Sequence, residues 1–288
     1  MRVIDAFDVP VRFAAVSPDG RFLAAAGGYE VGAWNWVSGE VVAEVTCPAA
    51  IGSVAFTADG NWVVFAYRGG LFRLATTSGA RPEQVSDFPF AGGVAISPDG
   101  KTLVATAAGS RHREHLYRWE LPAWRPALGF DFWSPFRRLA FSPNGEYLAG
   151  IDADTFELRI AVTGGLNGRQ RIRYVGDVFF AFPRDSQSVV FGWETDLHIM
   201  ETQNGQLLKR VPSPGPAFTD AAFLGSGRLL ATVDGTPVLR VWSAETWEVL
   251  REYDWSAGGL TCVNASADGL AAVCGTEHGK LVVFDVDE

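Results

Sequence analysis

The sequence predicts an all-β protein folded as a seven-bladed β-propeller with four antiparallel strands per blade, and three observations lead to this prediction. A turn motif occurs seven times, each copy is flanked by short apolar segments of strand length, and the first segment of the chain has no partner in its own repeat. The copies lie 40 to 45 residues apart, a period that suits one small sheet. Because the repeats use up the chain, we expect residues 1–288 to form a single domain.

The repeated motif reads apolar–x–Ser/Thr–Pro/Ala–Asp–Gly and predicts a tight turn between two strands. Asp or Asn followed by Gly is typical of such turns, because these residues tolerate a positive φ. The motif is clear in four repeats and degrades in three. Its copies are AVSPDG (15–20), AFTADG (55–60), AISPDG (95–100), AFSPNG (140–145), AFPRDS (181–186), AFLGSG (222–227) and NASADG (264–269).

Two positions within the repeat indicate how the blades pack. Ala15, just before the first turn, is matched by alanine in the next five repeats and by Asn264 in the last. Alanine is a poor strand former, so this position predicts a crowded innermost strand. A bulky residue follows each turn by 15 or 16 residues, from Trp34 to Phe284, except that Trp119 follows its turn by 20. We expect these bulky side chains to fill the blade cores.

The two ends of the chain predict how the ring closes. The last repeat ends with KLVVFDV (280–286) and lacks a fourth segment, whereas RVIDAFDV (2–9) precedes the first complete repeat. Pairing of the N-terminal segment with the last blade supplies the missing strand and removes an open sheet edge. We therefore expect the N-terminal strand to close the ring.

Three segments of the chain resemble the WD-repeat family of the WD-40 type. They are VGAWNWVSGEVV (31–42), GTPVLRVWSAETWEVLREYD (235–254) and CGTEHGKLVVFDV (274–286), and the SPDG turns stand at the corresponding offset. The resemblance covers the whole chain, and it implies a seven-bladed propeller that acts as an interaction platform. No repeat contains the Gly-His dipeptide of the family, so the family's His–Ser–Trp–Asp network is not implied here.

Composition argues against several classes of protein. The chain is 48% hydrophobic and long enough to bury a core, and no run of about 18 apolar residues predicts a membrane helix. The first residues lack the apolar core of a signal peptide, so we expect a cytoplasmic protein. The SPDG turns and the preference for Arg over Lys favour a bacterial source. A net charge of −9 opposes binding to nucleic acid or to an anionic membrane.

Residues that commonly carry chemistry are scattered along the chain. Cys47, Cys262 and Cys274 are expected to be free buried thiols, although Cys262 and Cys274 flank one turn, which leaves a pair between them open. His112 and His115 have a spacing that suits zinc, but no cysteine or third histidine lies near them in the sequence. We expect no metal, no cofactor and no catalytic set.

Two classes of function remain open from the sequence. Propeller hydrolases gather polar side chains at the axis from separate blades, so a lactonase-like or other hydrolase with its site at the mouth of the central channel would show no linear motif. Asn264 is the one polar residue in the alanine position, which equally suits a residue beside a water-filled channel. The first expectation is a scaffold that binds a protein or peptide partner, as a monomer or as a subunit of a complex.

One face of the predicted ring is rich in aromatic residues and arginine. It carries the loops before each first strand and those between the second and third strands, whereas the opposite face has small polar turns. Trp, Tyr and Arg are enriched at interface hot spots. We expect a partner to bind an exposed patch on this face. For Phe136 the sequence leaves a second possibility, that its ring packs under its own loop. The expected binding residues are Tyr67, Arg68, Phe90, Trp133, Phe136, Arg137, Trp193 and Trp255.

Overall fold

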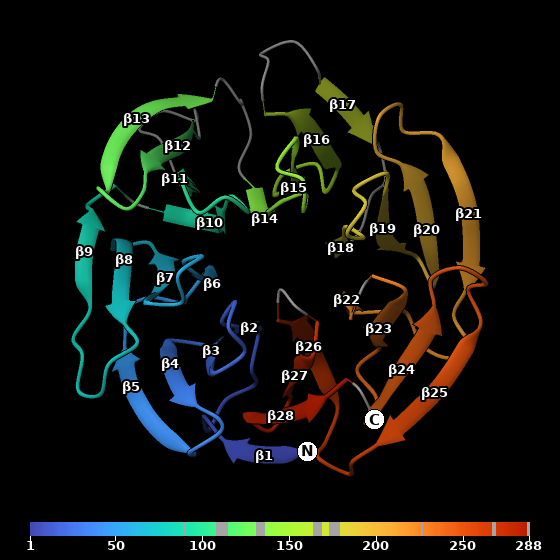
Figure 1. Cartoon of the computed structure of the whole chain (residues 1–288), viewed down its shortest axis with the longest axis horizontal. Helices are drawn as coiled ribbons and strands as arrows, with labels where there is room; N and C mark the ends of the chain where they lie inside the picture. The colour runs from blue at the N-terminus through green and yellow to red at the C-terminus, as the bar shows by residue number, and fades with distance from the viewer. Residues whose placement is uncertain are drawn as a thin grey trace.

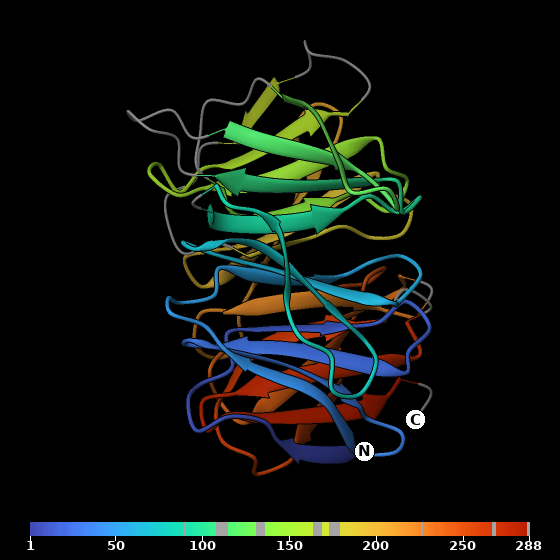
Figure 2. The ribbon, with the colours of Figure 1, turned by 90° about the vertical axis from the view of Figure 1, so that its left-hand side faces the viewer.

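The seven repeats form seven four-stranded antiparallel sheets arranged around a central axis in the computed structural model of the chain (Figure 1). This structure describes residues 1–88, 90–107, 115–130, 136–163, 169–172, 179–225, 227–266 and 269–286. Seen from the side, the strands cross the thickness of the ring and the connecting loops gather on its two faces (Figure 2). The predicted seven-bladed propeller is confirmed.

Each of the first six blades runs in chain order from its innermost strand to the rim. Blade 1 contains β2 (Phe13–Val16), β3 (Phe22–Gly27), β4 (Glu30–Asn35) and β5 (Glu40–Thr46); blade 2 contains β6 (Ser53–Phe56), β7 (Trp62–Tyr67), β8 (Gly70–Ala75) and β9 (Glu83–Ser86); blade 3 contains β10 (Phe90–Ile96), β11 (Thr102–Ala107), β12 (His115–Glu120) and β13 (Arg125–Phe130).

Blades 4 to 6 follow the same order. Blade 4 contains β14 (Phe136–Phe141), β15 (Tyr147–Asp152), β16 (Leu158–Val162) and β17 (Arg169–Ile172); blade 5 contains β18 (Phe180–Ala181), β19 (Ser188–Trp193), β20 (Asp196–Glu201) and β21 (Leu207–Pro212); blade 6 contains β22 (Asp220–Leu224), β23 (Leu229–Val233), β24 (Val238–Ser243) and β25 (Val249–Asp254).

Blade 7 is built from both ends of the chain, as predicted. Its strands are β26 (Leu260–Ala265), β27 (Ala271–Thr276), β28 (Lys280–Asp285) and, at the rim, β1 (Arg2–Asp5). The antiparallel register runs from Arg2 opposite Val283 to Asp5 opposite Lys280. The chain then passes into blade 1, where the Phe7 ring packs edge-on against Trp34 with their centroids 5.6 Å apart. Closure therefore combines strand pairing with packing between the last blade and the first.

The hydrophobic core lies between blades, because each sheet buries its faces against its two neighbours. The described residues form a buried apolar cluster at every junction between successive blades, including the junction of blade 7 with blade 1. The bulky third-strand residues belong to these layers, with Trp34 and Trp119 no more than 2% exposed. Their predicted role in the blade cores is confirmed.

The repeated turn is held by one hydrogen-bond pattern. In blade 1 the Ser17 hydroxyl accepts a hydrogen bond from the Phe22 N–H at 2.9 Å and donates one to the Asp19 carboxylate at 2.6 Å. Gly20 follows with a φ of +69°, which an L side chain rarely adopts. The same bond between hydroxyl and Asp or Asn side chain recurs at Thr57–Asp59, Ser97–Asp99 and Ser142–Asn144.

The three cysteines are buried and free. Cys262 and Cys274 lie on the paired strands β26 and β27, where Cys262 is opposite Gly275 and Cys274 is opposite Val263. The two thiols are therefore separate, and the disulfide that the sequence left open is not formed. Burial raises the pKa of the Cys262 thiol to about 12, which keeps it protonated. Within the described residues, no helix is long and apolar enough to span a bilayer.

Candidate functional site

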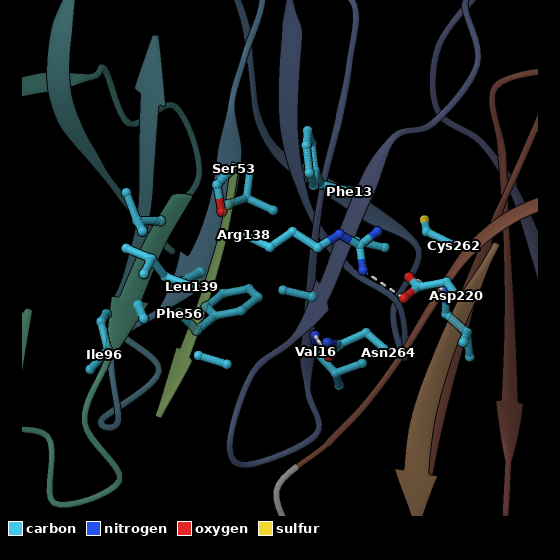
Figure 3. Close-up of a pocket in the computed structure, with 18 of the residues that line it drawn as sticks. Phe13, Val16, Ser53, Phe56, Ile96, Arg138, Leu139, Asp220, Cys262 and Asn264 are labelled. Atoms are coloured by element: carbon cyan, nitrogen blue, oxygen red, sulfur yellow. Dashed lines mark hydrogen bonds and ion pairs between the residues drawn. The ribbon is translucent and has the colours of Figure 1, made fainter. Parts of the chain in front are cut away.

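The central channel is bounded by the innermost strands, and alanine is the most frequent residue type in its wall. A cavity of about 370 Å³ follows the axis (Figure 3). The alanines that line it include Ala15, Ala55, Ala95 and Ala140. These residues occupy the repeated position for which the sequence predicted a crowded innermost strand. The small side chains allow seven strands to converge on one axis and still leave an open space.

Two residues before each alanine lies a position that does not repeat. From blade 1 to blade 7 it holds Phe13, Ser53, Gly93, Arg138, Phe179, Asp220 and Cys262. Only two of these side chains are charged. Their charges are opposite, and they come from blades 4 and 6.

Arg138 and Asp220 form an ion pair across the channel. The Arg138 side chain extends from β14 toward Asp220 at the start of β22, where its Nη1 lies 2.7 Å from Oδ1 (Figure 3). The Asp220 carboxylate also accepts hydrogen bonds from the backbone N–H groups of Ala221 at 3.0 Å and Val263 at 3.2 Å. Asp220 is only 6% exposed, so these donors replace the water that it loses. The pair thus connects blades 4, 6 and 7 at the axis.

A second space lies at the end of the channel that carries the loops before the first strands, and we call it the mouth cavity. Its volume is about 690 Å³, within the range of ligand-binding pockets. Its apolar walls include Val11, Phe13, Ile151, Phe218 and Leu260, from blades 1, 4, 6 and 7. Its charged lining residues are Arg12, Arg137, Arg138 and Glu277.

Arg12 and Arg137 occupy the same position of the repeat, five residues before the turn serine. Blades 2 and 3 have glycine there, and blades 6 and 7 have Thr219 and Thr261. Blades 1 and 4 are three steps apart around the ring, so the segments that carry the two arginines reach the mouth cavity from well-separated sides (Figure 1). Glycine at Gly92 is required by close packing, because an added Cβ would lie 1.9 Å from the Phe136 carbonyl oxygen.

The two arginines differ in their surroundings. The Arg137 guanidinium lies over the Phe156 ring, 4.4 Å from its centroid. Arg12 is exposed, and its side chain forms no ion pair with any carboxylate in the described part of the chain. Glu277, the acidic residue of the lining, accepts a hydrogen bond from the Gly259 N–H at 2.9 Å. The mouth cavity therefore combines apolar walls with an excess of guanidinium groups in a protein of net charge −9.

Two of the predicted binding residues are not exposed, which corrects the expectation of one exposed patch. Phe136 is 3% exposed and packs in the layer between blades 3 and 4, so its open alternative, burial, is the one observed. Tyr67 is 9% exposed, and its ring stacks on Phe72 at 5.0 Å because the two residues are diagonal neighbours on the paired strands β7 and β8, where Tyr67 itself lies opposite Gly70. Burial also raises the pKa of the Tyr67 hydroxyl.

The remaining predicted residues lie in different blades. Arg68 is exposed in the turn between β7 and β8, Trp193 is half-buried at the end of β19, and Trp255 is half-buried against Tyr253 and Phe284. Of the predicted residues whose side chains the structure describes, Arg137 alone lines the mouth cavity. Trp133 and the side chain of Phe90 lie outside the described residues. The role of these residues in binding stays a prediction.

Asn264 has a structural contact. Its Oδ1 accepts a long hydrogen bond of 3.4 Å from the Val16 N–H, which joins blade 7 to blade 1 beside the channel (Figure 3). Across the described ranges, no group of three or more His, Cys, Asp or Glu side chains is arranged to hold a metal ion. His112 lies outside those ranges, as does the side chain of His115.

Sequence reasoning missed Arg12, Arg138 and Asp220. When the seven repeats are aligned at the turn serine, two adjacent positions hold uncharged residues in most blades and a charged residue in two blades each. These departures from the repeat are the signal that would have identified the three residues. What alignment does not show is that blades 4 and 6 bring Arg138 and Asp220 into contact. No protein-family model matches the chain, and no curated protein matches it.

Proposed function

We propose that this protein is a scaffold that binds a protein or peptide partner at the mouth cavity. The observation that carries the proposal is the composition of that cavity: arginines from opposite sides of the ring converge over apolar walls of ligand-binding size. Arginine is among the residues most enriched in interface hot spots. The alanine-rich channel wall and the mutually neutralised Arg138–Asp220 pair beneath it support a binding role.

We further propose that the chain is related to WD-repeat propellers, and that it works in the cytoplasm of a bacterium. Blade 6 carries the closest sequence resemblance, at 235–254, and there the Trp242 indole N–H donates to the Thr232 hydroxyl at 2.8 Å. A tryptophan of the third strand is thus bonded to a hydroxyl of the second strand in this blade, although the blade lacks the Gly-His dipeptide of the family. This bond supports the relationship in the blade where the sequence motif is strongest.

Affinity capture from the native cell tests the binding role. The bait is the full chain, compared with a double variant, Arg12→Ser with Arg137→Ser. Both side chains are exposed and line the mouth cavity, so we expect partner capture to weaken by roughly 1–3 kcal/mol per hot spot with little change in melting temperature. Arg21→Ser is the matched control, because Arg21 is an exposed arginine on the opposite face. A partner captured equally by the double variant and the wild type would contradict the proposal.

A further inference from the structure

We infer that the mouth cavity recognises a carboxylate attached to an apolar group, such as the C-terminal residue or an acidic side chain of a partner peptide. The site is the one proposed above for partner binding, and its ligand chemistry is now specified. The inference rests on that proposed function where the carboxylate belongs to a peptide. Arg12 is the residue that we assign to the carboxylate, with Arg137 opposite it.

The charges around the cavity favour an anion of low charge. Three arginines, Arg12, Arg137 and Arg138, face two carboxylates, those of Asp220 and Glu277. Arg138 is engaged by Asp220 at 2.7 Å, whereas Arg12 forms no ion pair within the described part of the chain. Arg12 therefore presents one guanidinium group, which matches a single carboxylate. A doubly charged phosphate would exceed the compensation that one guanidinium group supplies.

The shape of the guanidinium group adds to this preference. Arginine presents parallel N–H donors that match the two oxygens of a carboxylate, and charge-assisted bonds of this kind are stronger than neutral ones. Arg12 belongs to the segment that leads into β2, where its backbone N–H donates to the Ala26 carbonyl at 2.8 Å. Its main chain is therefore fixed by the blade, and only the side chain must be ordered on binding.

The walls select the rest of the ligand. Three apolar residues that line the cavity keep accessible surface beside Arg12: Phe13 is half-buried, and Pro10 and Ala217 are exposed. A ligand that is charged throughout would leave these walls without a partner, whereas an aliphatic or aromatic group next to the acid would cover them. The polar floor of the cavity is the Arg138 side chain, which is already paired with Asp220. A ligand therefore does not have to supply a counter-ion for it.

Binding of small probes tests the inference on the full chain. The free acid is 4-phenylbutyrate, its neutral control is 4-phenylbutyramide, and phenyl phosphate is the dianionic control. The peptide pair is an acetylated pentapeptide ending in Leu-Phe with either a free C-terminal carboxylate or a C-terminal amide. Affinity is measured by calorimetry or ligand-observed NMR at low ionic strength, with wild type, Arg12→Gln and the control Arg21→Gln. Melting temperatures confirm that each variant is folded.

We expect each acid to bind at least about tenfold more tightly than its amide, and we expect Arg12→Gln to remove most of that difference while Arg21→Gln leaves it unchanged. Binding of 4-phenylbutyrate without binding of the peptide acid would support the carboxylate site and contradict the proposed peptide scaffold. Equal affinity for acid and amide, tighter binding of phenyl phosphate, no binding of any probe, or an unchanged preference in Arg12→Gln would overturn the inference. The partner capture described above is scored separately, so the two failures are distinguishable.

Discussion

The two ends of the innermost strands differ in how closely the blades repeat one another. At the turn end, four blades use the same hydroxyl-to-Asp or Asn hydrogen bond, at distances of 2.5 to 2.6 Å. At the mouth end, equivalent positions hold arginine, glycine, valine or threonine, and the next position holds seven residues of which Arg138 and Asp220 alone are charged. The difference teaches that repeated residues build the ring, whereas residues that depart from the repeat distinguish one blade from another and form the candidate site.

Removal of the N-terminal strand is expected to have the largest effect, because it acts on the repeated scaffold. Deletion of residues 2–9 exposes the edge of β28 and removes Phe7 from Trp34. We expect a loss of about 4 kcal/mol or more in the free energy of unfolding, measured by denaturant titration. Val3→Ser on the exposed face of β1 is the control and should be nearly neutral. A truncated chain that melts within a degree or two of the full chain would show that closure does not depend on this strand.

Disruption of the ion pair at the mouth end is expected to come next. Arg138→Met leaves the Asp220 carboxylate buried without its cation and should cost about 3 kcal/mol of unfolding free energy. The double variant Arg138→Met with Asp220→Leu should be less destabilised than the sum of the single variants, because it removes both charges. Denaturant titration of all four proteins gives the coupling energy. Additive single effects would mean that the two side chains do not interact across the channel.

Loss of the turn hydroxyls should have smaller effects that are equal from blade to blade. Ser17→Ala, Ser97→Ala and Ser142→Ala each remove the acceptor of a backbone N–H bond of 2.9 Å and a donor to the turn side chain. We expect each to cost about 1–2 kcal/mol and the three values to agree closely, as measured by thermal and denaturant unfolding. Ser78→Ala at an exposed loop position serves as the control. Widely different losses would contradict the view that this end is one repeated design.

The smallest effect concerns pH and the buried His198 in blade 5. Its ring is 3% exposed and lies against Phe191 and Trp193. Burial and the nearby Arg210 hold the pKa of His198 below its ordinary value, against the opposite influence of Asp196 and Glu194. The unfolded chain therefore takes up the proton first, so the stability contribution is complete above about pH 6.5 and is lost below it.

His198→Phe should remove this part of the pH dependence. We expect the wild type to lose stability relative to the variant as the pH falls below about 6.5, with a slope no steeper than about 1.4 kcal/mol per pH unit for one proton. The measurement is the unfolding free energy across that range, and His278→Gln, at an exposed histidine, is the control. Parallel pH profiles for wild type and His198→Phe would contradict the assignment.

The sequence predicted the parts of the structure that repeat. Ala15 and Trp34 stand at positions that recur from blade to blade, so periodicity alone indicated the innermost strand, the blade cores and the closure by β1. The expected exposure of Tyr67 was wrong and that of Phe136 was left open, because residue type does not show whether a side chain at a strand end is covered by its own sheet. The Arg138–Asp220 contact spans 82 residues and depends on which blades face one another, which no local pattern contains.

Site-specific photo-crosslinking tests most directly the claim that the mouth, where the repeat is broken, is the binding end. A benzophenone amino acid is placed at Thr219, an exposed residue of the mouth cavity, or at Lys101, an exposed residue of a repeated turn on the opposite face. After irradiation in the native cell, crosslinked products are identified by mass spectrometry. Our account predicts a defined partner crosslinked through position 219 and none through position 101. The same partner crosslinked through position 101 and not through 219 would contradict it.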